Sequence, residues 1–242
     1  MLNVSKIKGI IFDYGATIDS DGKHWAEVLW DTYTEIKVPV SKENFREAYV
    51  YGERYLALHP VIKPEHTFKD VLLSKTGLQI NWLVKSGILS GDNAKISSYS
   101  LAISDQCYNF ARSTVLKAEP ILKQLAEKYP LVLVSNFYGN IEAVLADFGI
   151  IGYFNKIVES AIVGVRKPDP AIFGLGMEAL NFRPEEVVVI GDSHRKDIVP
   201  AMTLGCQTIW IKGSGWEEES LSLEADTVIY EFSELKNIFQ LN

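Results

Sequence analysis

Apolar residues fill several short segments of the chain without alternating with polar ones. Four of these segments have the length of a strand and a fifth is weaker; they are residues 9–13, 131–135, 187–191, 208–211 and 227–230. Strands of a parallel sheet are buried on both faces, so nearly every position in them is apolar. The pattern therefore predicts a parallel β-sheet with helices on both faces.

Helical segments separate these runs and have recognisable ends. Pro120 suits the first turn of a helix that carries the apolar residues after it. Gly149 and Gly205 each follow apolar residues at helical spacing, the second after residues 195–204, and each suits the left-handed residue that ends a helix. Strands and helices that alternate in this way predict a doubly wound α/β fold.

Residues 18–114 contain no comparable apolar run. Apolar side chains recur there at helical spacing over residues 25–36, 45–56, 68–72 and 96–110, and Ser41 suits the N-cap of the second segment. We therefore predict an α-helical domain that is inserted after the first strand of the sheet.

The composition excludes several classes of protein. The 242 residues are 47% hydrophobic and carry a formal charge of −7, which excludes wholesale disorder and argues against nucleic-acid binding held mainly by electrostatics. No apolar run reaches the roughly 18 residues of a membrane span, and the run near the amino terminus is too short for a signal peptide. We expect Cys107 and Cys206 to be buried and reduced. We also expect a cytoplasmic protein that binds neither nucleic acid nor membrane.

Polar residues follow the ends of the predicted strands. In an open parallel sheet the carboxyl ends of the strands meet at the edge where ligands bind. The candidates for this edge are Asp13, Ser135, Asn136, Lys167, Asp192 and Asp197. Carboxylate oxygens suit a hard divalent cation such as Mg²⁺, and a lysine beside them would balance charge and hold an anion.

These stretches resemble the motifs of the haloacid dehalogenase (HAD) superfamily of phosphohydrolases. The matching segments are FDYGAT at residues 12–17, VSN at 134–136, RKPDP at 166–170 and GDSHRKD at 191–197. The resemblance covers nearly the whole chain. It implies a HAD-like Rossmannoid core over residues 1–17 and 115–242, a helical C1-type cap over residues 18–114, Mg²⁺ as cofactor and a small phosphorylated metabolite as substrate.

The resemblance also implies a role for each matching residue. Asp13 would be the nucleophile that forms an aspartyl-phosphate, Ser135 would hydrogen-bond the phosphoryl oxygens, and Lys167 would offset the charge between nucleophile and phosphate. The metal-binding set would be Asp13, Gly15 through its backbone carbonyl, Asp192 and Asp197, the last as a ligand or as an orienting group. The substrate-binding set would be Tyr14, Gly15, Thr17 and Asn136.

Gly15 departs from the family's pattern. Phosphatases of the family carry a second Asp at this position, two residues after the nucleophile, as general acid and base. Such catalysis contributes about 10²–10⁴-fold in rate. Asp19, Asp21 or His24 could supply the missing group, and a substrate with a good leaving group, such as an acyl phosphate, would need less proton help.

Two other functions stay open on the sequence alone. A retained HAD scaffold without catalysis would bind a phosphorylated ligand or a partner. The phosphonate-cleaving branch has a small residue at the position of Gly15 and uses a cap lysine that forms a Schiff base; the cap candidates are Lys37, Lys42, Lys63, Lys69 and Lys85. Tyr51, Arg54 and Tyr55 could face substrate from the cap, but we expect helical packing there. The sequence predicts neither the substrate nor the oligomeric state.

Overall fold

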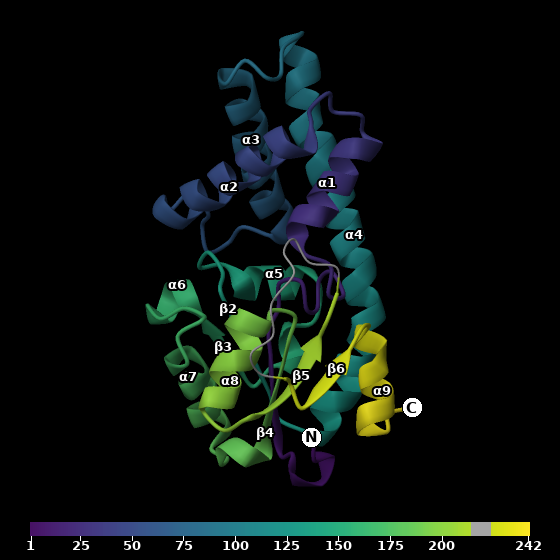
Figure 1. The fold of residues 1–242 in the computed structure, drawn as a ribbon, viewed down its shortest axis with the longest axis vertical. Coiled ribbons are helices and arrows are strands. Elements are labelled where there is room, and N and C mark those ends of the chain that lie inside the picture. The colour runs from purple at the N-terminus through teal and green to yellow at the C-terminus, as the bar shows by residue number, and fades with distance from the viewer. Residues whose placement is uncertain (214–223) are drawn as a thin grey trace.

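The computed structural model describes residues 1–213 and 224–242. Residues 213–222 are rich in Gly, Ser and Glu, which predicts a surface loop, and most of this segment lies outside the described residues. The described residues form a six-stranded parallel sheet in the order β3-β2-β1-β4-β5-β6 (Figure 1). The strands are β1 Gly9–Phe12, β2 Leu131–Ser135, β3 Lys156–Glu159, β4 Val187–Gly191, β5 Gln207–Ile211 and β6 Thr227–Ile229. The five predicted strands are confirmed to within one residue at each end.

Strand β3 is the one that the apolar pattern missed. It lies at the edge of the sheet and pairs only with β2. Its first residue, Lys156, is exposed and Ile157 is half-buried. A short edge strand of this kind has no continuous apolar run, so the criterion that found the other strands could not find it.

Helices cover both faces of the sheet, which confirms the doubly wound α/β fold. Ile10 and Phe12 of β1 face the cluster that includes the second half of α4, while Ile11 faces the cluster that includes α7 and α8. The helices are α1 Trp25–Glu35, α2 Lys42–Leu58, α3 Phe68–Lys85, α4 Asn93–Lys128, α5 Ile141–Asp147, α6 Ser160–Val163, α7 Ala171–Leu180, α8 Val199–Thr203 and α9 Leu235–Phe239. Within the described residues, none of these helices has the length and apolar character needed to cross a bilayer.

Several expected helix signals are confirmed. Ser41 accepts a hydrogen bond from the backbone N–H of Asn44 and so caps α2. Gly149 and Gly205 have φ of +75° and +87°, the left-handed conformation that ends a helix. Cys107 and Cys206 are both buried and free.

The expectation that Pro120 begins a helix is wrong. Helix α4 is continuous from Asn93 to Lys128, and Pro120 lies inside it. A proline ring removes the hydrogen bond to the carbonyl four residues earlier, here Leu116. The Leu116 side chain is 62% exposed, so this carbonyl lies on the side of the helix that water reaches. The predicted boundary between cap and core at residues 114 and 115 also falls inside α4, and the division into two domains stays a prediction.

Helices α2 and α3 and the segment between them pack against the loop that joins β2 to α5. Tyr138 in this loop donates a hydrogen bond from its hydroxyl to Glu53 Oε2 of α2, at 3.1 Å, and Lys75 Nζ of α3 lies 2.7 Å from Glu53 Oε1. Asn140 Nδ2 donates to the backbone oxygen of His66, at 2.7 Å. The upper helices in Figure 1 are therefore held directly over the carboxyl end of β2.

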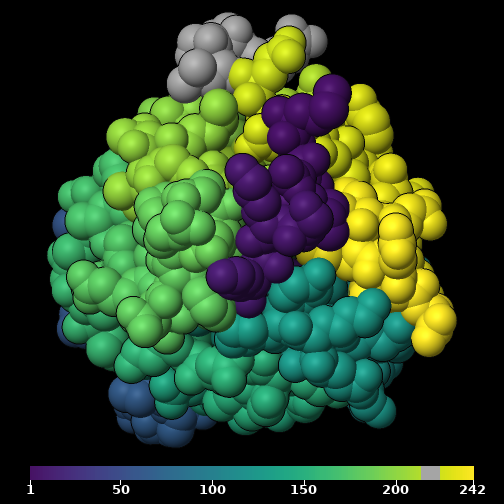
Figure 2. Space-filling model, turned by 90° about the horizontal axis from the view of Figure 1, so that it is seen from below, coloured from purple at the N-terminus to yellow at the C-terminus, as the bar shows by residue number. Residues whose placement is uncertain are grey.

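The opposite end of the sheet is closed by contacts of the amino terminus. Seen from the side away from the cap, the first residues of the chain lie against the C-terminal part of the core (Figure 2). The Met1 ammonium lies 2.9 Å from Asp226, and the backbone N–H of Asn3 donates to Gln207 Oε1 at 2.6 Å. This arrangement leaves the carboxyl ends of the strands as the edge available for a site.

Glu159, at the end of β3, caps helix α5 across the sheet edge. Its Oε1 accepts hydrogen bonds from the backbone N–H groups of Gly139 and Asn140, and its Oε2 accepts one from Ile141 at 3.3 Å. Glu159 is buried. It therefore satisfies three backbone donors of the loop that carries Asn140 into α5.

We expect Glu159→Ala to lower the free energy of unfolding by about 2–3 kcal/mol, because it leaves buried N–H groups without an acceptor. Glu142→Ala is the matched control, since Glu142 is an exposed acid in the first turn of the same helix; its loss should cost about 0.3–1 kcal/mol. Urea unfolding of both variants measures the difference. Equal destabilisation would contradict the capping role of Glu159.

Candidate active site

The carboxyl ends of three adjacent strands meet at one point. Strand β1 lies between β2 and β4, and helix α4, which leads into β2, and helix α7, which leads toward β4, cover opposite faces of the sheet. A crevice opens at such a switch point and is the usual ligand site of this fold. Asp13 follows β1, Ser135 ends β2, and Asp192 follows β4; Asp13 and Ser135 are buried.

Lys167 joins two of the acids. Its Nζ lies 2.5 Å from Asp13 Oδ1 and 2.7 Å from Asp197 Oδ1, and all three residues are at least 94% buried. Burial by itself lowers the pKa of Lys167, but the two carboxylates outweigh that effect and raise it above the ordinary value. The lysine is therefore a fixed positive charge in contact with the predicted nucleophile.

Asn136 fixes the backbone of Lys167. Its Nδ2 donates to the Lys167 carbonyl at 3.0 Å, and its Oδ1 accepts from the Lys167 N–H at 2.9 Å. Sequence reasoning placed Asn136 among the substrate contacts, and it did not foresee this two-way clamp. The side-chain amide ties the loop after β2 to the loop that carries the lysine.

Thr17 connects the acids that follow β1 and β4. Its Oγ1 lies 3.0 Å from Asp13 Oδ2 and 3.2 Å from Asp192 Oδ1, within hydrogen-bond reach of both. The indole N–H of Trp210 donates to the Asp192 carbonyl at 2.7 Å and fixes the backbone there. Trp210, on β5, is a supporting residue that the motif comparison did not single out.

Three carboxylates can share one cation at this point. Asp13, Asp192 and Asp197 each offer an oxygen, and these oxygens lie within 4.8 Å of one another. Burial, and then the charge of Asp13, raises the pKa of Asp192 well above its ordinary value. Burial also raises the pKa of Asp197 to about 6, although Lys167 opposes the shift. A hard divalent cation fits this donor set, because it would relieve both the desolvation and the repulsion.

The position of Asp197 depends on a glycine. A Cβ on Gly191, the last residue of β4, would lie 2.6 Å from the Asp197 carboxylate, so no larger residue fits there without displacing the acid. The backbone N–H of Ser193 donates to Asp197 Oδ2 at 3.0 Å. The helix expected over residues 195–204 consists of a π-helical turn, His194–Ile198, followed by α8. The π-helical turn brings Asp197 back toward the end of β4.

Two predicted substrate contacts lie in different surroundings. Gly15 is half-buried, and a Cβ at this position would have no neighbouring atom within 4 Å, so space is open beside the nucleophile. The Tyr14 ring is fully buried and packs edge-on against Phe68 and Phe137. The side chain of Tyr14 is thus in the hydrophobic core, and only Gly15 borders open space.

The candidate substitutes for the missing acid are held by other bonds. Asp19 accepts hydrogen bonds from the Ala16 N–H on one oxygen, at 2.7 Å, and from the Trp25 indole on the other, at 2.9 Å. Burial raises the pKa of Asp19 to about 7. Asp21 accepts from the Phe232 N–H at 2.6 Å. His24 caps α1 through Nδ1, and burial lowers its pKa.

Comparisons with known proteins agree with this geometry. The family model for haloacid dehalogenase-like hydrolases matches residues 7–202. Glyceraldehyde 3-phosphate phosphatase of Pyrococcus furiosus is 29% identical over 175 residues, which are 71% of this chain and 68% of that protein. The 5-amino-6-(5-phospho-D-ribitylamino)uracil phosphatase YigB of Escherichia coli is 30% identical over 124 residues, 51% of this chain and 50% of that protein, so the match spans about half of YigB.

A solved structure shows the same fold over almost the whole chain. The HAD-hydrolase YfnB of Bacillus subtilis superposes with a TM-score of 0.57 at 17% identity, and the match covers 97% of this chain and 99% of that one. The fold, the order of the motifs and the family model therefore agree. The chain belongs to the haloacid dehalogenase-like hydrolases.

Proposed function

We propose that the chain is a Mg²⁺-dependent phosphatase that acts on a small phosphorylated metabolite through an aspartyl-phosphate on Asp13. The contact between Asp13 and the buried Lys167, with two further acids beside them, carries this proposal. The glyceraldehyde 3-phosphate and ribitylaminouracil phosphatases among its relatives support phosphate esters of small metabolites as the substrate class.

The proposed reaction has two displacements at phosphorus. An oxygen of Asp13 attacks phosphorus, and the bond between phosphorus and the leaving oxygen breaks. Water then attacks the phosphorus of the aspartyl-phosphate, which releases inorganic phosphate and restores Asp13. Lys167 offsets the charge that builds on the phosphoryl oxygens, and Ser135 donates a hydrogen bond to them.

The residues present fit a bound Mg²⁺. Asp13, Asp192 and the backbone carbonyl of Gly15 would hold the ion. Asp197 accepts hydrogen bonds from Lys167 Nζ and from the Ser193 N–H, and it would orient the groups that hold the ion. When bound, the ion supplies positive charge that draws a phosphate group into an otherwise acidic pocket.

The open space at Gly15 sets the substrate preference within this proposal. No acid stands there, and the carboxylates of Asp19 and Asp21 are held by the bonds described above. A leaving group that needs no proton, such as a carboxylate or a phenolate, therefore suits the site best. The presence of glycine instead of an acid at position 15 also favours a second candidate function, a HAD scaffold that binds a phosphorylated ligand without turnover.

A phosphonate-type mechanism has less support from the cap lysines. Lys42 and Lys69 form ion pairs with Glu27 and Asp105 and are substantially exposed. Lys75, which was not among the candidates from the sequence, has a side chain that is only 11% exposed. Burial alone would lower its pKa, but Glu53 and nearby tyrosines raise it well above the ordinary value. A lysine that stays protonated is a poor nucleophile for a Schiff base.

We expect Asp13→Asn to reduce the release of phosphate from acetyl phosphate or p-nitrophenyl phosphate by at least about 10³-fold, because it removes the nucleophile. Asp105→Asn, a substitution of an exposed acid on α4, should leave the rate unchanged. A phosphate-release assay with Mg²⁺ compares the three proteins. Equal rates for wild type and Asp13→Asn would refute the proposal.

We expect Gly15→Asp to raise turnover of an unactivated alkyl phosphate by about 10²–10⁴-fold, because it restores a general acid and base. The substitution has room, since nothing lies within 4 Å of the new Cβ. Gly15→Asn is the matched control, because it has the same shape and cannot transfer the proton. A gain in both variants, or in neither, would show that the missing acid does not limit the reaction.

We expect Mg²⁺ to stabilise the wild-type protein by about 2.7 kcal/mol at 100 times its Kd, measured by thermal unfolding. Asp192→Asn should lose most of this gain, and Asp105→Asn should keep it. Protons compete with the ion at low pH, because burial raises the pKa of Asp192 well above its ordinary value and that of Asp197 to about 6. The gain should therefore shrink as the pH falls through 6; a gain that persists in Asp192→Asn would contradict the metal site.

A further inference from the structure

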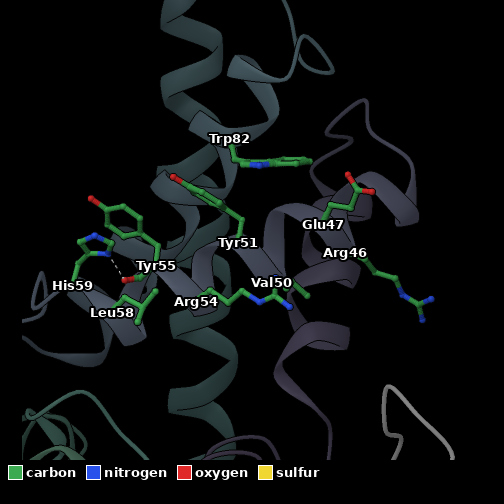
Figure 3. Close-up of a pocket in the computed structure, with 9 residues that line it drawn as sticks. All are labelled: Arg46, Glu47, Val50, Tyr51, Arg54, Tyr55, Leu58, His59 and Trp82. Carbon is green, nitrogen blue, oxygen red and sulfur yellow. Dashed lines mark hydrogen bonds between the residues drawn. The ribbon is translucent and has the colours of Figure 1, made fainter.

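Helix α2 has one buried face and one exposed face. The buried face packs on the rest of the cap through Phe45, Ala48, Gly52 and Leu56. The other face borders an open groove of about 650 Å³ between α2 and Trp82 of α3 (Figure 3). Of the three residues for which helical packing was expected, Tyr51 and Arg54 are exposed on this groove and Tyr55 is half-buried, and the Tyr51 ring lies 6.0 Å from the Tyr55 ring.

The exposed face is apolar along its middle and at its end. Val50 and Tyr51 are 39% and 37% exposed, and Leu58 is 78% exposed. The Trp82 ring lies 6.4 Å from the Tyr51 ring and extends the apolar surface onto α3. Apolar side chains gathered in one exposed groove mark an interaction surface.

Two of the three charged residues that line this groove, Glu47 and Arg54, are placed symmetrically along α2. Glu47 and Arg54 lie seven residues apart, which is about two helical turns, so they are on the same face with Val50 and Tyr51 midway between them. In the described part of the chain, neither Glu47 nor Arg54 takes part in an ion pair. Each of these two charges is thus available to a partner.

We propose that this face binds the same face of a second copy of the chain, with the two α2 helices antiparallel and a two-fold axis between Val50 and Tyr51. In this register Glu47 of each copy meets Arg54 of the other, and Val50 of each meets Tyr51 of the other. A two-fold interface requires a surface that complements itself, and the pairs Glu47 with Arg54 and Val50 with Tyr51 meet this requirement.

The charges of Glu47 and Arg54 disfavour simpler alternatives. A parallel pairing would place Glu47 against Glu47 and Arg54 against Arg54, and like charges in contact are unfavourable. An acidic peptide in the groove would leave Glu47 opposed by charge of its own sign, and a basic peptide would do the same to Arg54. The antiparallel copy pairs both charges at once.

Sedimentation equilibrium of the full chain over a wide range of loading concentrations tests the proposal. Wild type should approach twice the chain mass of 27.1 kDa. Glu47→Arg and Arg54→Glu should each shift the distribution to the monomer, and the double variant Glu47→Arg with Arg54→Glu should restore the dimer. A wild type that stays monomeric, single variants that stay dimeric, or a double variant that stays monomeric would each overturn it. Circular dichroism confirms that every variant is folded.

Disulfide trapping tests the register independently. Both native cysteines are buried, so a cysteine introduced on α2 is the reactive one. Val50→Cys lies at the proposed axis and should form a disulfide-linked dimer under mild oxidation. Leu58→Cys is equally accessible, but it would lie fifteen residues, or about 22 Å, from its counterpart along the helix and should not cross-link. Cross-linking of Leu58→Cys but not of Val50→Cys, or of both equally, would contradict the register.

Discussion

The buried Lys167 side chain between Asp13 and Asp197 is the interaction on which the rest of the site depends. A lysine and two carboxylates are costly to remove from water, and only their mutual contacts offset that cost. The contacts at 2.5 and 2.7 Å leave the lysine charged and the group as a whole negative. In the proposed function, this one contact prepares the site both for a cation and for the phosphate that the cation would attract.

The fold brings this group together by supporting each member from a different strand. Asn136, after β2, clamps the backbone of Lys167, and Gly191, at the end of β4, leaves the space that the Asp197 carboxylate fills. Thr17, in the loop after β1, holds the remaining acids. Because each support acts through backbone or short side chains, the site has little freedom to rearrange, as preorganised electrostatic catalysis requires.

The sequence predicted those parts of the structure that depend on local pattern. Strands that are buried on both faces are apolar throughout, and this pattern predicted five of the six strands. Strand β3 lies at the edge and is half-exposed, so it has no continuous apolar run. The polar residues after the apolar runs predicted that Asp13, Asp192 and Asp197 lie close together, and the structure brings these acids together with Lys167. The Asn136 clamp and the need for glycine at position 191 depend on distances between remote segments, so spacing along the chain could not reveal them. The burial of Tyr14 could have been predicted from the sequence, because the side chains of neighbouring residues at a strand end, here Asp13 and Tyr14, point to opposite sides.

The central claim is that a covalent phosphoryl group forms on Asp13. With no acid or base at Gly15, attack of water on this intermediate should be slow, so the intermediate should accumulate during turnover. The direct measurement is an acid quench seconds after mixing the protein with Mg²⁺ and acetyl phosphate, followed by mass spectrometry of the peptide that contains Asp13. We expect a phosphoryl group on Asp13 in a large fraction of molecules. Phosphate release with no phosphoryl group on the protein, or with the group on another residue, would contradict it.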